Sequence, residues 1–328
     1  MTLLVEKESF TLKIVQQTSM SAIQRDLIFD VGMNDGEDTG YYLSRGFRVV
    51  GIYADPSMIE VVKSTFPEEV KNSRLILLNC AVSSENDEEV QFYLNEDPHW
   101  NSLDQSLTER GVAGSGGLIM VKTKMLPAIM QEFGIPYYCK IDVQGFDAVL
   151  LRILLPSEER PAFISVEAEC DPKTEEQALE TLERLHDLDY EKFKLVDQAS
   201  LRVLTPSKRI YGEPGGSFRS TDPLMRKIYT HLRPKTKFYG LSSSGPISRL
   251  REEWRLNFHR RFLSMKLRYS FAVGSSGPFN DDLGSEWLDY RTAKEMAIRH
   301  RREYFESISS GWNYPSKGFW CDWHAKLN

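Results

Sequence analysis

Cysteine is scarce in this sequence, and its placement excludes a cross-linked framework. The four cysteines are Cys80, Cys139, Cys170 and Cys321, which lie far apart in a chain of 328 residues. Disulfide frameworks and structural zinc sites need cysteines at close, repeated spacings. We therefore expect buried, reduced thiols. No metal ligands are predicted, because Cys321 and His324 have no further ligands nearby.

Long hydrophobic runs are also absent. The chain contains no stretch of about 18 apolar residues, the length that a membrane-spanning helix needs. Charged residues at positions 6–8 directly follow its short apolar start. Neither a membrane span nor a secretory signal is predicted, and we expect a cytoplasmic protein.

An excess of positive over negative charge is concentrated in one segment of the chain. The net charge is -6, yet residues 206–270 carry 15 Lys/Arg against 4 Asp/Glu, a balance of +11 that leaves -17 for the remainder. Such a segment favours an acidic partner. Nucleic acid is not expected, because the chain is acidic overall and shows no nucleic-acid-binding motif.

A buried strand that ends in a glycine turn is predicted at residues 27–36. Its apolar run contains Asp30 near the carboxyl end, and Gly32 and Gly36 permit a tight turn and the close approach of a ligand. Ligands of open α/β sheets bind at the carboxyl ends of the strands. The stretch is therefore expected to hold a nucleotide-like cofactor.

The rest of the chain alternates predicted strands and helices. Further buried strands are expected at 48–54, 75–82, 136–143, 162–167 and 193–197, short strands at 89–94 and 119–123, and a late strand at 269–273. Amphipathic helices are expected at 173–187, 248–265 and 290–307, and a flexible glycine-rich loop at 111–117. This alternation predicts an α/β fold with a doubly wound, mostly parallel sheet.

Four segments follow from this pattern. An N-terminal extension covers 1–21, the core 22–205, a basic insertion 206–267, and a last strand with a helical and aromatic tail 268–328. The insertion is expected to cap the pocket or to form an oligomer interface.

The glycine turn does not have the G-x-G-x-x-G spacing of dinucleotide-binding proteins. Acidic residues at the strand end and in the turn would repel a pyrophosphate and favour a cationic ligand. The sulfonium and amino group of S-adenosylmethionine fit better.

Four motifs in order then carry a family resemblance. They are 30–36 (DVGMNDG), 49–56 (VVGIYADP), 140–146 (KIDVQGF) and 164–167 (ISVE). The chain resembles class I S-adenosylmethionine-dependent methyltransferases of the FkbM family over about residues 22–200. The resemblance implies a seven-stranded Rossmann-like sheet and transfer of a methyl group to a hydroxyl, commonly of a sugar or a polyketide.

The resemblance also implies which residues bind the cofactor. The predicted set is Asp30, Gly32, Asn34, Gly36, Tyr53, Asp55, Ala81 and Asp142. The chain departs from the family pattern twice: Tyr53 replaces the acid that holds the ribose hydroxyls, and Gln144 replaces a glutamate. A tyrosine cannot accept the bidentate pair that a carboxylate accepts. Either Asp55 substitutes or cofactor affinity is weakened.

Methyl transfer requires alignment of the reactants and removal of a hydroxyl proton. The candidate bases are Asp142, Glu167 and Glu169 at strand ends and His99 in the variable segment, with Asp142 and Glu167 ranked first. These acids are alternatively placed to hold one Mg²⁺, although no metal is predicted.

The acceptor and partners follow from the insertion and the tail. Arginines such as Arg249, Arg251 and Arg255 suit a nucleotide-linked or anionic glycan, and the tail's tryptophans suit packing on the core or in a homo-oligomer. The alternative function is a non-catalytic binding or assembly protein on a decayed methyltransferase fold.

Overall fold

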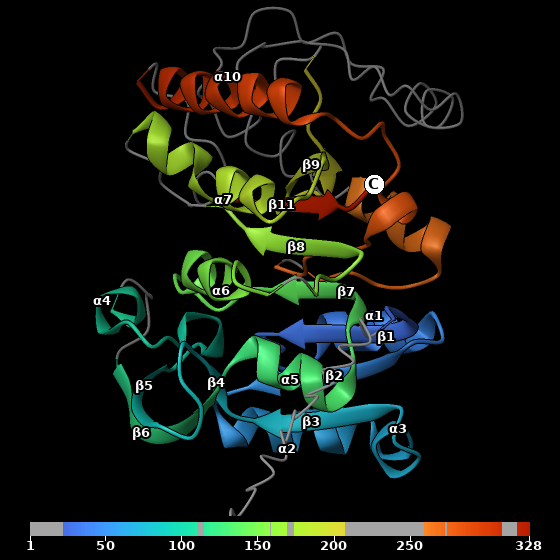
Figure 1. Ribbon diagram of the computed structural model, residues 1–328, viewed down its shortest axis with the longest axis vertical. Helices are drawn as coiled ribbons and strands as arrows, with labels where there is room; N and C mark the ends of the chain where they lie inside the picture. The colour runs from blue at the N-terminus through green and yellow to red at the C-terminus, as the bar shows by residue number, and fades with distance from the viewer. Residues whose placement is uncertain are drawn as a thin grey trace, which may run out of the picture.

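The computed structural model describes residues 22–109, 115–157, 159–168, 174–206, 259–272, 274–309 and 320–328. A central sheet runs through the molecule, with helices against it (Figure 1). Its strand order is β10-β9-β11-β8-β7-β1-β2-β3. The strands are β1 (Gln24–Val31), β2 (Arg48–Tyr53), β3 (Leu75–Asn79), β7 (Pro136–Ile141), β8 (Phe163–Glu167), β9 (Lys192–Asp197), β10 (Arg202–Val203) and β11 (Cys321–Lys326).

Most of the sheet is parallel. Strands β3, β2, β1, β7 and β8 are parallel neighbours, whereas β11 pairs antiparallel with both β8 and β9. Strand order reverses at β1, because the chain first builds outward through β2 and β3 and then returns to place β7 on the other side. In open α/β sheets, ligands bind at the carboxyl ends of the strands beside such a switch point.

The central strands separate two hydrophobic cores, because successive side chains of a strand point to opposite faces. In β1, Phe29 belongs to one core and Ile28 to the other. The Phe29 core lies under α5 (Leu126–Phe133), α6 (Asp147–Leu154), α7 (Glu175–Asp187) and α10 (Tyr290–Ser309). The Ile28 core lies under α1 (Glu37–Ser44) and α2 (Pro56–Thr65), with α3 (Pro67–Lys71) following at its edge.

A second, three-stranded sheet lies beyond the carboxyl ends of the central strands, on the side toward which the arrows of β1 and β7 point (Figure 1). It contains β4 (Ala81–Val82), β5 (Glu89–Asn95) and β6 (Ser115–Lys124). The short helices η1 (Pro98–Trp100) and α4 (Gln105–Thr108) follow β5. This small sheet and η1 supply one side of the pocket described below.

The segment 274–284 packs over α1 on the Ile28 face of the sheet. Phe279 stacks on Tyr138 of β7, with ring centroids 4.1 Å apart and an interplanar angle of 4°. The Tyr41 hydroxyl donates a hydrogen bond to Asp282 over 2.7 Å. Asp282 belongs to the short helix η2 (Asn280–Leu283). The C-terminal part of the chain therefore covers the start of α1.

The expected α/β fold with a mostly parallel sheet is confirmed, but the expected count of seven strands is wrong. Among the described residues the central sheet has eight strands, because the two-residue β10 extends it beyond β9. It is mixed because β11 is antiparallel to both of its neighbours. The strand predicted at 75–82 is divided between β3 and β4, which belong to different sheets.

The prediction of a strand at 269–273 is also wrong for the described residues 269–272. Residues 269–272 form no strand, and the last strand is β11, inside the predicted aromatic tail. Aromatic side chains explain the error, because Tyr269 and Phe271 pack against the Tyr41 ring with centroids 5.3 and 4.9 Å away instead of joining the sheet. The predicted loop 111–117 overlaps β6, which begins at Ser115.

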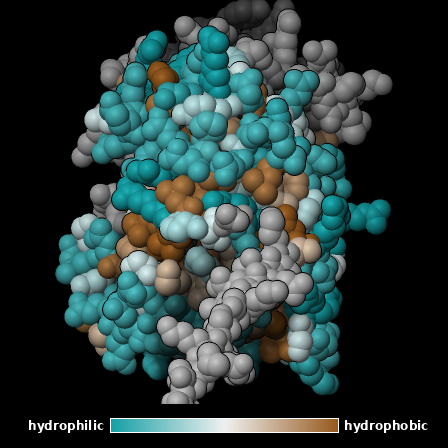
Figure 2. Space-filling model, viewed as in Figure 1, coloured by the Kyte–Doolittle hydropathy of each residue, from teal (hydrophilic) through white to brown (hydrophobic). Residues whose placement is uncertain are grey.

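The surface is predominantly hydrophilic on the face seen in Figure 2, with hydrophobic residues gathered at the level of α6. Among the described residues, no helix combines the length and the apolar character needed to cross a membrane.

Candidate functional site

A pocket with about 790 Å³ of empty space lies at the carboxyl ends of β1, β2 and β7. Its wall includes residues from the glycine turn after β1, from β4 and β5, from η1 and from the turn after β7. Gly274 and Ser275 add a further part of the wall from a distant point in the sequence. The pocket therefore occupies the position that the sheet's switch point predicts.

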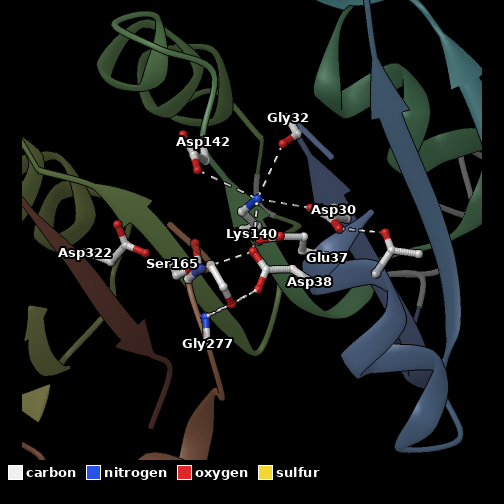
Figure 3. Close-up of polar contacts among 12 residues, drawn as sticks. Asp30, Gly32, Glu37, Asp38, Lys140, Asp142, Ser165, Gly277 and Asp322 are labelled. Atoms are coloured by element: carbon white, nitrogen blue, oxygen red, sulfur yellow. Dashed lines mark hydrogen bonds and ion pairs between the residues drawn. The ribbon is translucent and has the colours of Figure 1, made fainter. Parts of the chain in front are cut away.

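Lys140 lies at the centre of a buried charge cluster beside this pocket (Figure 3). Its Nζ lies 3.2 Å from Asp38 Oδ2, 3.4 Å from Asp30 Oδ1 and 3.7 Å from Asp142 Oδ2, and it donates to the Gly32 carbonyl over 3.4 Å. Burial alone would lower the pKa of Lys140, but the three carboxyl groups raise it well above its usual value. The ammonium therefore stays charged. These four side chains, of Lys140, Asp30, Asp38 and Asp142, are called the Lys140 cluster below.

Asp30 contacts Lys140 within this cluster but does not line the pocket. The side chain is fully buried, and its Oδ2 accepts a hydrogen bond from the Thr39 hydroxyl over 2.7 Å. Burial raises the pKa of Asp30, and the charge of Lys140 opposes that rise. Asp30 therefore contacts the pocket wall through Lys140, and its predicted role in cofactor binding stays a prediction.

Gly32 and Gly36 are each needed for a different structural reason. At Gly32, where φ is +83°, a Cβ atom would lie 1.7 Å from the carbonyl oxygen of Asp142. Only glycine lets the turns after β1 and β7 approach so closely. Gly36 has φ +86° and precedes α1, and a Cβ there would meet Val62 of α2 at 3.1 Å. Gly32 lines the pocket, whereas Gly36 lies outside its wall.

Asn34 has a polar atom without a partner. Its backbone is left-handed, with φ 51°, and its Oδ1 is buried without a hydrogen bond although the residue lines the pocket. A buried acceptor without a partner is costly. This oxygen fits an N–H donor of a bound ligand, as the predicted site requires.

The end of β2 differs from the predicted ribose site. The Tyr53 hydroxyl donates to the Pro98 carbonyl over 3.0 Å, and burial raises the pKa of Tyr53, so the phenol stays neutral. Asp55 caps α2 by accepting from the Ser57 amide over 2.8 Å and does not line the pocket. Tyr53 and Ala81 are both on the pocket wall. Asp55 therefore lies off the pocket wall, and its predicted contact with the ribose stays a prediction.

His99 of η1 and Asp97, which caps the start of this helix, form a pair beside the pocket. The ring Nδ1 of His99 lies 2.9 Å from Asp97 Oδ1, and the same oxygen accepts the His99 backbone N–H over 3.2 Å. His99 lines the pocket. A carboxylate on one ring nitrogen fixes the tautomer and leaves the other nitrogen available. His99 was among the predicted candidate bases and Asp97 was not, although the spacing Asp-x-His is visible in the sequence.

The turn after β7 holds Asp142. Its Oδ1 accepts a hydrogen bond from the Gln144 side-chain amide over 3.1 Å, and both residues line the pocket. Gln144 has φ 49°, and its carbonyl accepts from the Ser102 hydroxyl over 2.9 Å. The amide that replaces the expected glutamate therefore has a donor function of its own.

Glu167 does not line the pocket, and Glu169 lies outside the described residues. Glu167 ends β8 opposite Asp322 of β11. Asp322 is buried, and its burial, assisted by the charge of Asp142, raises its pKa to about 8. Sequence analysis missed Asp322, because an acid within an aromatic tail gave no sign of a buried strand.

The described residues contain no group of three or more His, Cys, Asp or Glu side chains arranged to hold a metal ion. The carboxylates of the Lys140 cluster already surround an ammonium. Sequence analysis also missed Asp38 and Lys140 as members of the site. A lysine inside a predicted buried strand that borders on acidic turns was the available signal.

Comparison with known proteins identifies the domain. Residues 30–192 match the family model described as the methyltransferase FkbM domain. No curated protein matches the chain. One solved structure, the crystal structure of coclaurine N-methyltransferase bound to N-methylheliamine and SAH, aligns with 10% identity over 92% of this chain and 67% of that one. Its TM-score of 0.23 is too low to support an argument about fold or function. Residues 30–192 of this chain therefore belong to the FkbM methyltransferase family.

Proposed function

We propose that this chain is an S-adenosylmethionine-dependent O-methyltransferase that acts on a hydroxyl of a sugar, a glycan or a related small molecule. One observation carries the proposal. His99, whose ring pairs with Asp97, lines the same pocket as Asp142 and Lys140, at the carboxyl ends of β1, β2 and β7. A site for a cationic cofactor and a candidate base for a hydroxyl therefore share one cavity.

The pocket wall fits the cofactor by charge and by polarity. The Lys140 cluster has three carboxyl groups around one ammonium, which favours a sulfonium over an anion. The partnerless Oδ1 of Asn34 suits the cofactor's amino group. Apolar residues that include Ile52, Ala81 and Phe92 suit its adenine ring. When bound, the cofactor supplies a methyl group already activated for transfer.

His99 is the proposed general base. The acceptor hydroxyl must lose its proton as its oxygen is methylated, and the ring nitrogen opposite Asp97 can accept that proton. Asp97 holds the ring orientation and stabilises the imidazolium. Asp142, on the same pocket wall, is the second candidate base. Glu167 ranks below both, because it does not line the pocket.

The acceptor is proposed to be neutral rather than anionic. Asp35 and Glu37 lie on the pocket wall. Burial and the neighbouring charges of Asp35 and Asp38 raise the pKa of Glu37. A further negative charge would be repelled there. The arginines that suggested an anionic acceptor, Arg249, Arg251 and Arg255, lie outside the described residues.

Mass spectrometry of acceptor panels tests the proposal. Purified protein with S-adenosylmethionine is offered neutral sugars and glycans, nucleotide sugars and amines, and each product is examined for one added methyl group. We expect transfer to a hydroxyl of neutral sugars and little to nucleotide sugars. Transfer only to an amine nitrogen would overturn O-methylation, and transfer only to nucleotide sugars would overturn the neutral acceptor.

The second candidate is a binding or assembly protein that does not catalyse methyl transfer. It is favoured by the end of β2, where Tyr53 donates to Pro98 and Asp55 caps a helix, so that neither offers a carboxylate to a ribose. Calorimetric titration separates the two: no heat of binding at millimolar cofactor supports the second candidate. Recovery of binding by Tyr53→Glu would identify the missing group.

A further inference from the structure

The C-terminal segment reaches the Lys140 cluster through Asp38, 237 residues away in sequence. The Ser275 hydroxyl donates to Asp38 Oδ1 over 2.6 Å, and the backbone N–H groups of Ser276 and Gly277 donate to the same carboxylate over 3.1 and 3.3 Å. Asp38 therefore accepts three hydrogen bonds from one turn. This turn lies outside residues 30–192, over which the family model matches.

The same carboxylate also contacts Lys140, so Asp38 has two sets of partners. Its Oδ2 lies 3.2 Å from Lys140 Nζ, which in turn lies 3.7 Å from Asp142 Oδ2. Asp38, Lys140 and Ser275 are all at most 4% exposed. Buried charge networks of this kind have defined geometry, because every group that loses its partner costs desolvation free energy.

The contacts that run from Ser275 through Asp38 and Lys140 to Asp142 all lie at the pocket wall. Ser275, Asp38, Lys140 and Asp142 all line the pocket. Figure 3 shows the carboxylates of Asp38 and Asp142 directed toward Lys140 Nζ. A displacement of Asp38 would leave Lys140 nearer to Asp142 and would neutralise that carboxylate more fully. The negative potential available to a sulfonium depends on this balance.

We propose that Ser275 and Asp38 are positioning residues of the cofactor site, which set the place of the Lys140 ammonium and thereby the charge that Asp142 presents to the pocket. This inference rests on the proposed function. Residues 275–277 are then part of the binding site for a cationic cofactor, although they lie outside the matched domain.

The test compares affinities for S-adenosylmethionine and for S-adenosylhomocysteine, which lacks the sulfonium charge. Ser275→Ala removes the hydroxyl and keeps the number of charges. We expect it to weaken S-adenosylmethionine binding about tenfold, equivalent to about 1.4 kcal/mol, and S-adenosylhomocysteine binding less than threefold. Ser275→Thr, which keeps a hydroxyl, should restore most of the affinity. A merely structural loosening would weaken both ligands equally, and that result would overturn the proposal.

Tyr41→Phe is the matched control. It removes the hydrogen bond to Asp282, which holds the same C-terminal segment elsewhere, and leaves the Lys140 cluster intact. We expect the ratio of the two affinities to stay within twofold of wild type. An equal change of that ratio in Tyr41→Phe and Ser275→Ala would also overturn the proposal.

A second measurement does not depend on a ligand. Ser275 reaches Asp142 through Asp38 and Lys140, so Ser275→Ala and Asp142→Asn should be coupled in a double-mutant cycle of urea unfolding. We expect the shift of the double variant's midpoint to differ from the sum of the two single shifts. Additive shifts would overturn the positioning role. If the wild type bound neither ligand but the midpoint shifts were coupled, the proposed function would be overturned. The structural coupling between Ser275 and Asp142 would still hold.

Discussion

The side-chain amide of Gln144 donates a hydrogen bond to the Asp142 carboxylate over 3.1 Å, at the wall of the pocket. On its other side the carboxylate lies 3.7 Å from Lys140 Nζ. Asp142 is thus held between a neutral donor and a cation. Gln144, which departs from the family pattern, therefore contributes a hydrogen bond to the site.

Gln144→Met should therefore weaken cofactor binding. Methionine has a similar length but cannot donate, and hydrogen bonds to charged groups contribute about 1.5–3 kcal/mol. We expect the affinity for S-adenosylmethionine, measured by calorimetry, to fall at least about tenfold. Gln105→Met is the matched control, because Gln105 donates to Glu109 in an exposed amide–carboxylate pair on α4. Equal affinities of the two variants would show that the bond to Asp142 is unimportant.

His99→Gln should lower kcat and leave cofactor affinity almost unchanged. A positioned general base contributes about 10²–10⁴-fold to a rate, and the glutamine side chain cannot take up a proton. Asp97→Asn should give a smaller loss in kcat, because the base remains but its ring is held less firmly. A normal kcat in His99→Gln would leave Asp142 as the candidate base.

Asp322→Asn should stabilise the protein at alkaline pH. Burial raises the pKa of Asp322 from 3.8 to about 8, so the folded state binds a proton that the unfolded state releases between these values. Its contribution to stability is complete below pH 3.8 and is lost as pH rises through about 8. The asparagine variant avoids this loss, and its Tm should exceed that of wild type by at least about 3 °C at pH 9.

Thermal unfolding at pH 5 and pH 9 checks this prediction. The advantage of Asp322→Asn should be larger at pH 9. Glu89→Gln, at an exposed carboxylate, should show no such change. The same Tm difference at both pH values would mean that Asp322 is ionised at little cost.

Gly32→Ala should destabilise the protein more than Gly46→Ala. Both glycines have positive φ, +83° and +91°, so both alanine variants carry the cost of a left-handed backbone, roughly 1–3 kcal/mol. Only at Gly32 does the new Cβ meet a backbone atom, the Asp142 carbonyl oxygen at 1.7 Å, whereas nothing lies within 4 Å at Gly46. Urea unfolding of the two variants gives the difference. Similar losses would contradict the close approach of the two turns.

The sequence predicted the parts of the fold in which apolar runs alternate with helical periodicity. Strands β1, β2 and β7, the glycine turn and helix α7 followed from such patterns, because both faces of a parallel strand are buried. The last strand did not follow. Polar side chains of β11, Asp322 and His324, are each 1% exposed, so the strand lacks the apolar run that predicts a central position.

A row of buried polar residues explains that failure. Register pairs join Asp30 to Lys140, Lys140 to Ser165, Ser165 to His324 and His324 to Lys194 across five strands. Lys140, Ser165 and Lys194 each have a polar partner from another segment, as a buried polar group requires. Single-sequence patterns do not contain those partners.

The candidate site was predicted in the same uneven way. Gly32, Asn34, Tyr53, Ala81, His99 and Asp142 line the pocket, while Asp30, Gly36, Asp55 and Glu167 do not. Their roles remain predictions. Motifs placed residues at strand ends correctly, but they did not show that Asp55 is used as a helix cap or that Asp38 joins the pocket to residue 275.

Calorimetric titration of the wild-type chain with S-adenosylmethionine tests the central claim most directly. We predict saturable binding at one site per chain with a Kd below about 1 mM, within the usual range for enzyme ligands. Binding should be lost in a variant that fills the pocket wall, such as Ala81→Trp, provided that its circular dichroism matches wild type. No heat of binding at millimolar S-adenosylmethionine by folded wild-type protein would contradict the assignment of this pocket.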